Sequence, residues 1–127
     1  MRLTAFTATA VLALTTVSFA QADWIASQAE WMEQDDEVIV QLLSLTVEEL
    51  EDRDLYDAAG REIGEVKEVI GLSDGTVIGL AVEIDDYAGI EDYEQVVVPI
   101  DRVSPDGERL TTDLTVDELR ALPQWDD

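Results

Sequence analysis

Hydrophobic and polar residues alternate most regularly in the middle of the chain. Between Val77 and Ile84, every second residue from Ile78 onward is a large aliphatic one, which predicts a strand with one fully apolar face. Val96–Ile100 repeats the alternation. Because Pro99 has no backbone N–H, this second strand is expected near an edge or an end of the sheet.

Turn signals divide this region into short strands. Asp57–Gly60 predicts a hairpin loop with glycine where a positive φ is favoured, and Ser73–Gly75 predicts another turn. Ser104–Gly107 fits a type I turn, since proline stands second and glycine fourth. The central part of the chain is therefore expected to be a set of antiparallel strands.

The segment Glu62–Ile70 carries two conflicting patterns. Ile63, Val66 and Val69 lie three residues apart, as on a helix. Glycines at positions 60, 64 and 71 argue against a helix, because glycine is unfavourable in a helix interior. We interpret the segment as a strand with a bulge near Gly64.

A short element occurs twice, once on each side of the strand region. Leu45–Leu50 and Leu114–Leu119 both read Leu-Thr-Val-acid-Glu-Leu. Threonine followed three residues later by glutamate is the signature of a capping box, which begins a helix. The second helix is expected to run to about Leu122, before Pro123, with Val116, Leu119 and Leu122 facing inward.

The segment 23–45 contains neither glycine nor proline and is expected to be an N-terminal helical segment. Trp24, Ile25, Trp31 and Met32 recur at helical spacing among acids and amides, which predicts a short amphipathic helix. The acids that follow end this pattern. The next run, Val38–Leu43, is too short for its periodicity to distinguish strand from helix.

Residues 1–22 have the pattern of a secretory signal peptide. Arg2 precedes a mostly apolar run, and Ala20-Gln21-Ala22 is a small-x-small cleavage site. Five threonines dilute the run, whereas a spanning helix needs about 20 predominantly apolar residues. We expect cleavage, a periplasmic or secreted protein, and no stable membrane anchor afterwards.

Charge and composition exclude several classes of function. The chain has 30 acidic and 7 basic residues, so loss of Arg2 with the signal peptide leaves 6 − 30 = −24. Such a body repels nucleic acid and anionic lipid, and suits a basic protein partner, divalent cations or a salty environment. The absence of histidine and cysteine excludes Ser-His-Asp and Cys-His catalysis, the usual zinc or haem ligands, and disulfides. No cofactor is indicated.

The order of these signals resembles that of a PRC-barrel domain. The run Asp54–Ile70 is similar to the opening of that family, where a Tyr-Asp strand, a turn ending in glycine and an Ile-Gly-x-Val strand follow one another. Further similar landmarks follow in the family's order: Asp74-Gly75 before the Val77–Ile84 strand, Ala88-Gly89-Ile90, Val96–Asp101 and Leu114–Pro123. The resemblance covers residues 46–125. It implies a small antiparallel β-barrel that serves as an interaction module without catalysis.

Two groups of residues are candidate sites. Trp24, Trp31 and Met32 either pack against the barrel or anchor a partner, because aromatic residues and methionine are enriched in interface cores. The acidic loop Asp85–Glu94, with Asp85, Asp86, Glu91 and Asp92, is either a solvated loop or a calcium site, although it lacks the EF-hand spacing. Paired carboxylates could also serve acid–base chemistry, but a barrel of about 80 residues fills its own interior.

The sequence thus predicts a mainly β protein: a small antiparallel PRC-like β-barrel with a short N-terminal amphipathic helix and a short C-terminal helix. Its expected function is that of a non-enzymatic periplasmic interaction or scaffold module that presents acidic side chains to a protein partner, with self-association also open. The alternative is an acidic divalent-cation-binding envelope protein that uses the Asp85–Glu94 loop.

Overall fold

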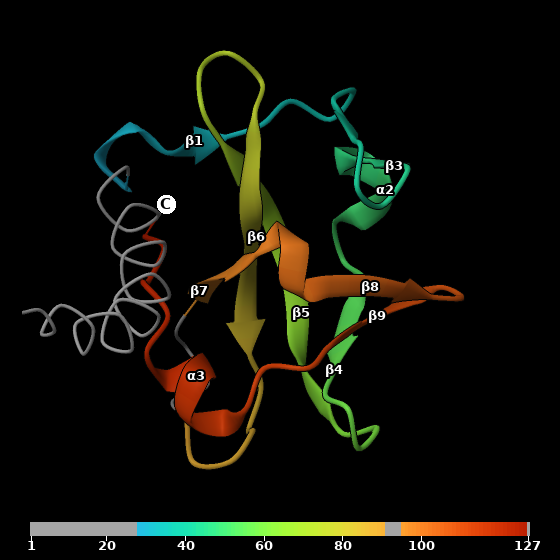
Figure 1. Ribbon diagram of the computed structural model, residues 1–127, viewed down its shortest axis with the longest axis vertical. Coiled ribbons are helices and arrows are strands. Elements are labelled where there is room, and N and C mark those ends of the chain that lie inside the picture. The colour runs from blue at the N-terminus through green and yellow to red at the C-terminus, as the bar shows by residue number, and fades with distance from the viewer. Residues whose placement is uncertain (1–27, 91–94, 127) are drawn as a thin grey trace, which may run out of the picture. The chain divides into compact units, whose positions relative to one another are not determined.

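The computed structural model describes residues 28–90 and 95–126 (Figure 1). Two compact units divide the chain, Met1–Glu30 and Trp31–Asp127. Within the described part of the first unit, Gln28–Glu30 forms a single 3₁₀ turn, η2. The predicted signal peptide and Trp24 lie outside the described residues.

A twisted sheet forms the body of the protein. Its hydrogen-bonded strand order is β7-β6-β5-β4-β9-β8. The two longest strands, β5 and β6, cross the middle of the body (Figure 1). The strands are β4 Asp54–Tyr56, β5 Glu62–Gly71, β6 Val77–Ile84, β7 Gln95–Pro99, β8 Val103–Asp106 and β9 Arg109–Thr112. The mainly β fold expected from the sequence is therefore confirmed.

The core follows the predicted alternation. Leu80, Val82 and Ile84 of β6 are fully buried, and Ile78 at the start of the strand is half-buried. Pro99 is the last residue of β7, so its missing N–H removes no bond from the middle of the sheet. Among the described residues, no helix is long and apolar enough to cross a membrane.

Gly64 marks the predicted bulge in β5. The register between β4 and β5 shifts here, because Leu55 lies opposite Gly64 and Tyr56 lies opposite Glu62. A Cβ atom on Gly64 would overlap the carbonyl oxygen of Glu83 on β6. Glycine is thus required for the close approach of the two backbones.

The hairpin between β8 and β9 differs from the predicted type I turn. Pro105 and Asp106 belong to β8, and Asp106 pairs with Arg109, so the loop is the two residues Gly107 and Glu108. Gly107 has a φ of 64°. Two-residue loops with a positive φ at their first residue match the twist of the flanking strands better than a type I turn does. Gly107 therefore stands at the second position of the observed turn, instead of the fourth position of the predicted one.

One strand pair corrects the expectation of a purely antiparallel barrel. Strand β4 pairs with β9 in parallel, with Leu55 opposite Leu110 and Tyr56 opposite Thr111. After β7, the 3₁₀ turn η3 (Ile100–Arg102) leads into the β8–β9 hairpin, and its second strand returns beside β4. The two strands are far apart in the sequence, so hairpin turn signals do not reveal this pairing.

The described part of the segment 23–45 also differs from the predicted helix. Strand β1 (Met32–Glu33) pairs with Gly71 and Ile70 at the end of β5. Its continuation donates a 2.9 Å hydrogen bond from Gln34 N to Val69 O. Strand β2 (Ile39–Val40) pairs with β3 (Leu45–Thr46) in a small separate ribbon. The backbone hydrogen bonds between β1 and β5 and between β2 and β3 therefore decide the structure of this segment, rather than the helical spacing of its side chains.

Both predicted helix starts are confirmed. Helices α2 (Val47–Leu50) and α3 (Val116–Arg120) each begin with a complete capping box, in which Thr46 and Thr115 accept from the backbone three residues on. Leu50 and Leu119 are buried at the fourth helical position. After α3, which ends two residues before the predicted Leu122, the chain returns along β7, where Val97 N donates to Pro123 O.

Candidate functional site

The loop after β6 holds the residues proposed for a cation. Asp85 and Asp86 are exposed, and Glu91 and Asp92 lie outside the described residues. Within the described ranges, no group of three or more acidic side chains has the arrangement of a metal site. Two hydrogen bonds hold the described part of this loop. Asp85 N donates to Ile63 O, and Arg120 Nη2 donates to Ala88 O at 2.6 Å.

Tyr87 anchors this loop to the β4–β5 turn. Its buried side chain donates a 2.7 Å hydrogen bond from the hydroxyl to Oδ2 of Asp57, and the guanidinium of Arg61 lies 4.9 Å from the ring centroid. This hydrogen bond is the main reason why the pKa of Asp57 is lowered. Burial first, and then the Asp57 carboxylate, raise the pKa of Tyr87. Tyr87, Asp57 and Arg61 thus hold the loop after β6 against the β4–β5 turn, which is a structural role.

The candidate anchors Trp31 and Met32 differ in exposure. Trp31 is 7% exposed, and Met32 is 45% exposed. The burial of Trp31 fits the packing role that the sequence left open, whereas Met32 is accessible. Trp24, the third residue of this group, lies outside the described residues.

Two exposed apolar residues were not identified from the sequence. Ile39 on β2 and Leu42 in the following turn are 55% and 67% exposed. Their neighbours Val40 and Leu43 are buried. The periodicity of Val38–Leu43 did not show which of its residues are exposed, although the acids Asp35–Glu37 before it indicated that its start lies near water.

A hollow of about 530 Å³ lies between the α2–β4 connection and the β8–β9 hairpin. Its walls consist of exposed or half-buried residues: Glu51, Asp52, Arg53, Asp54, Tyr56, Asp106, Glu108 and Arg109. Arg53 joins the two walls, because its Nε donates to Glu49 O and its Nη1 donates to Gly107 O. Arg109 stacks 4.1 Å from the centroid of the Tyr56 ring.

The chemistry of this hollow favours binding over catalysis. Tyr56 supplies its one aromatic wall, and the remaining lining is charged and open to water, whereas substrate pockets are mostly apolar and enclosed. Burial and the nearby carboxylates of Asp36, Asp52, Glu33 and Glu48 raise the pKa of Glu51. Carboxylates that repel one another in this way favour a cationic group beside them.

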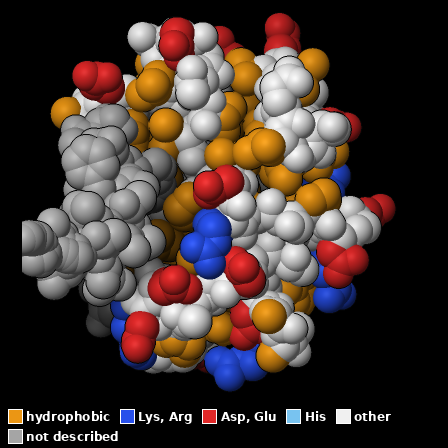
Figure 2. Space-filling model, viewed as in Figure 1, with side chains coloured by type: hydrophobic (Ala, Val, Ile, Leu, Met, Phe, Trp, Pro, Cys, Tyr) orange, Lys and Arg blue, Asp and Glu red, His pale blue; other side chains and the backbone are white. Residues whose placement is uncertain are grey.

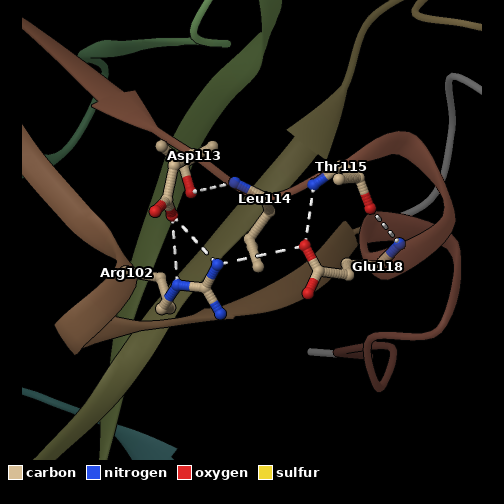
Figure 3. A network of polar contacts seen from close by, with 6 residues as sticks. Arg102, Asp113, Leu114, Thr115 and Glu118 are labelled. Carbon is tan, nitrogen blue, oxygen red and sulfur yellow. Dashed lines mark hydrogen bonds and ion pairs between the residues drawn. The ribbon is translucent and has the colours of Figure 1, made fainter.

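Arg102 joins η3 to the start of α3 (Figure 3). Its Nη2 lies 3.0 Å from Oδ1 of Asp113 and 3.9 Å from Oε1 of Glu118. Glu118 also closes the capping box, since its Oε1 accepts from Thr115 N at 2.9 Å. This network holds the start of α3 in place, and its one guanidinium, that of Arg102, is already paired with carboxylates.

The fold and the site thus define a small β-barrel module. The hollow formed by its described residues is polar and open to water. The family model of the PRC-barrel domain matches residues 44–119, more than half of the chain. The chain therefore belongs to the PRC-barrel domain family, as its sequence landmarks predicted. No curated protein matches it. The matched region begins just after Leu43, so β1, β2 and the exposed Ile39 and Leu42 precede it.

Proposed function

We propose that this chain is a non-enzymatic PRC-barrel module that acts in the periplasm or outside the cell and binds a basic protein partner through exposed carboxylates. The observation that carries this proposal is that the basic side chains are already engaged in contacts within the protein. All six in the described residues already have partners within the protein, whereas the acidic residues far outnumber them.

The engaged cations leave the negative charge uncompensated. Lys67 pairs with Glu65 and Glu83, and Arg102 and Arg120 pair with carboxylates of their own neighbourhood. Arg61 and Arg109 lie over tyrosine rings, and Arg53 donates to backbone carbonyls. A formal charge of −23 must then be balanced by solvent ions or by a partner.

The same charge selects the kind of partner. Phosphate backbones and anionic lipid headgroups are repelled by such a protein, whereas lysine and arginine side chains are attracted and steered towards it. The family is a non-catalytic fold, and the chain's lack of histidine and cysteine agrees with a role without catalysis. The signal-peptide pattern of residues 1–22 supports export.

Two measurements test the proposal on the expressed full-length chain. Mass spectrometry of the protein recovered from the periplasm should show a mature N-terminus at Asp23. Crosslinking in cells, followed by calorimetry with the purified crosslinked partner, should show saturable binding that weakens as salt is raised. An uncleaved cytoplasmic product contradicts the location. A partner that is acidic, or binding that does not depend on salt, contradicts the mode of binding.

A further inference from the structure

In the part of the chain that the structure describes, the exposed large apolar side chains lie close together in the sequence. Among the described residues, the exposed large hydrophobic side chains are Met32, Ile39 and Leu42. All three precede residue 44, where the family match begins. In the described residues, the family-matched barrel buries its large apolar side chains, whereas the segment in front of it buries Val40 and Leu43 but leaves three others exposed.

Ile39 and Leu42 stand on a firmly held ribbon. Strands β2 and β3 pair through Ile39–Thr46 and Val40–Leu45. The turn between them is closed by a 2.8 Å hydrogen bond from Ser44 N to Val40 O, and Val40 and Leu43 are buried in the core. The backbone that carries the two exposed side chains is thus held in place, so binding a partner costs little ordering of the ribbon.

Carboxylates border this ribbon on both sides. Asp35, Asp36 and Glu37 precede it, Glu48 follows it, and all four are exposed. Glu48 N donates to Asp36 O at 3.1 Å, and Val47 N donates to Val38 O at 2.9 Å, so the two acidic segments lie side by side. From residue 28 to residue 52 the sequence has nine acidic residues and no basic one.

Figure 1 places β3 and α2 at one end of the body, away from α3 and from the β4–β5 turn. In Figure 2, hydrophobic side chains gather over the same upper part of the visible face, and carboxylates stand at its margin. An apolar centre with a charged rim is the usual anatomy of a protein–protein interface.

We propose that the ribbon surface, made of Ile39, Leu42, Asp35, Asp36, Glu37 and Glu48, docks an amphipathic segment of a partner protein that presents apolar side chains between lysines or arginines. This inference rests on the proposed function and names the surface that performs it. Ile39 and Leu42 bury against the partner's apolar side chains, and the four carboxylates pair with its cations.

Charge complementarity decides between this occupant and two others. A second copy of the chain docked by the same surface would bring carboxylates against carboxylates, which is unfavourable. A bilayer would accept the apolar side chains, but anionic headgroups would repel the carboxylates around them. A basic amphipathic segment satisfies both features of the surface.

The test uses the protein purified after expression of the whole chain, and a short helical peptide of leucine and lysine with leucines on one face. Calorimetry should show saturable binding of this peptide. Two control peptides, with serine for leucine or with glutamate for lysine, should bind at least about tenfold more weakly. The peptide controls report on the surface without any change to the protein.

Two variants with the same change in net charge test the location. The ribbon triple variant, Asp35→Asn with Asp36→Asn and Glu37→Gln, should lose about tenfold or more in affinity. The remote triple variant, Glu62→Gln with Asp101→Asn and Asp117→Asn, should lose much less. The double variant Ile39→Ser with Leu42→Ser should also lose about tenfold, and its melting curve verifies that it is folded.

The outcomes separate this inference from the proposed function. Equal losses in the two triple variants, or no loss in the serine double variant, would mean that basic segments bind without using the ribbon; the inference fails and the proposed function stands. Sedimentation that shows a dimer lost in Leu42→Ser, or binding to zwitterionic vesicles lost in the same variant, also overturns it. Failure of every basic probe to bind overturns the proposed function itself.

Discussion

The hydroxyl of Tyr87 donates a 2.7 Å hydrogen bond to Oδ2 of Asp57, a residue 30 positions earlier in the chain. The other oxygen of that carboxylate accepts from Ala59 N and Arg61 N, so one aspartate both closes the β4–β5 turn and holds the loop after β6. Two loops at the same end of the barrel are thereby joined through one acidic side chain.

Removal of this hydrogen bond should destabilise the fold. Tyr87→Phe keeps the buried ring and leaves Asp57 without its hydroxyl partner, at an expected cost of about 1 kcal/mol. Urea unfolding measures the change. Tyr56→Phe is the matched control, because Tyr56 contacts Arg109 through its ring. Equal costs for the two variants would show that the hydroxyl bond to Asp57 contributes nothing.

The same bond should affect the response to acid. The pKa of Asp57 is lowered in the folded protein, chiefly by the Tyr87 hydrogen bond. A lowered carboxyl pKa contributes stability above the unfolded pKa, and this stability is lost as the pH falls through the folded pKa. The stability difference between wild type and Tyr87→Phe should therefore narrow on acidification below about pH 4. A constant difference from neutral pH to acid would contradict this linkage.

Glu51 should show the opposite dependence on pH. Its pKa is raised by burial and by the neighbouring carboxylates, so its ionisation opposes folding as the pH rises through and above the ordinary glutamate range. Glu51→Gln should raise the melting temperature at neutral pH by a few degrees at most, since its partial exposure weakens the repulsion. The gain should vanish below about pH 4. Glu108→Gln, at the tip of the β8–β9 hairpin, controls for the change in net charge.

Gly64→Ala should be among the most damaging single substitutions in the barrel. The added Cβ would overlap the carbonyl oxygen of Glu83, so β5 and β6 would have to separate, at an expected cost of about 3 kcal/mol. Gly107→Ala offers a comparison: nothing lies within 4 Å of a Cβ there, and only the positive φ is strained. That strain costs about 1 kcal/mol. Similar melting temperatures for the two variants would contradict the close-approach argument.

The capping box of α3 should contribute a measurable part of the stability. Thr115→Ala removes the oxygen that accepts from Glu118 N, and should cost about 1 kcal/mol. Thr115→Ser retains the hydroxyl and should cost clearly less. Arg102→Gln removes two half-exposed ion pairs and should cost less than the loss of the cap. Thermal unfolding of the three variants gives the order of their stability losses. A larger loss for Arg102→Gln than for Thr115→Ala would contradict this interpretation.

The parts of the fold that sequence reasoning recovered are those that depend on near neighbours. A capping box needs only Thr46 and Glu49, and the alternation that buries Leu80 and Val82 lies within one strand. The parallel pairing of Leu55 with Leu110 depends instead on where a distant hairpin returns. No local pattern encodes that return.

The candidate surface was harder to predict for the same reason. Helical spacing grouped Trp31 with Met32, but backbone pairing with β5 separates them, with one side chain buried and the other exposed. The exposure of Ile39 follows from a ribbon that buries Val40 on its other side. The acids Asp35–Glu37 just before that run were the available signal, and charge alone does not tell which apolar residues remain exposed.

The backbone of the C-terminal tail bonds to β7. Val97 N donates to Pro123 O and Trp125 N donates to Gln95 O, so residues 123–125 cover the outer edge of β7, the strand at one end of the sheet order. An unoccupied strand edge is a template on which further copies can polymerise. Truncation before Pro123 would uncover such a template on a protein that otherwise resists aggregation through mutual repulsion. The tail therefore covers one edge of the sheet, where the backbone groups that would pair with another copy are neutral and repulsion between like charges protects least.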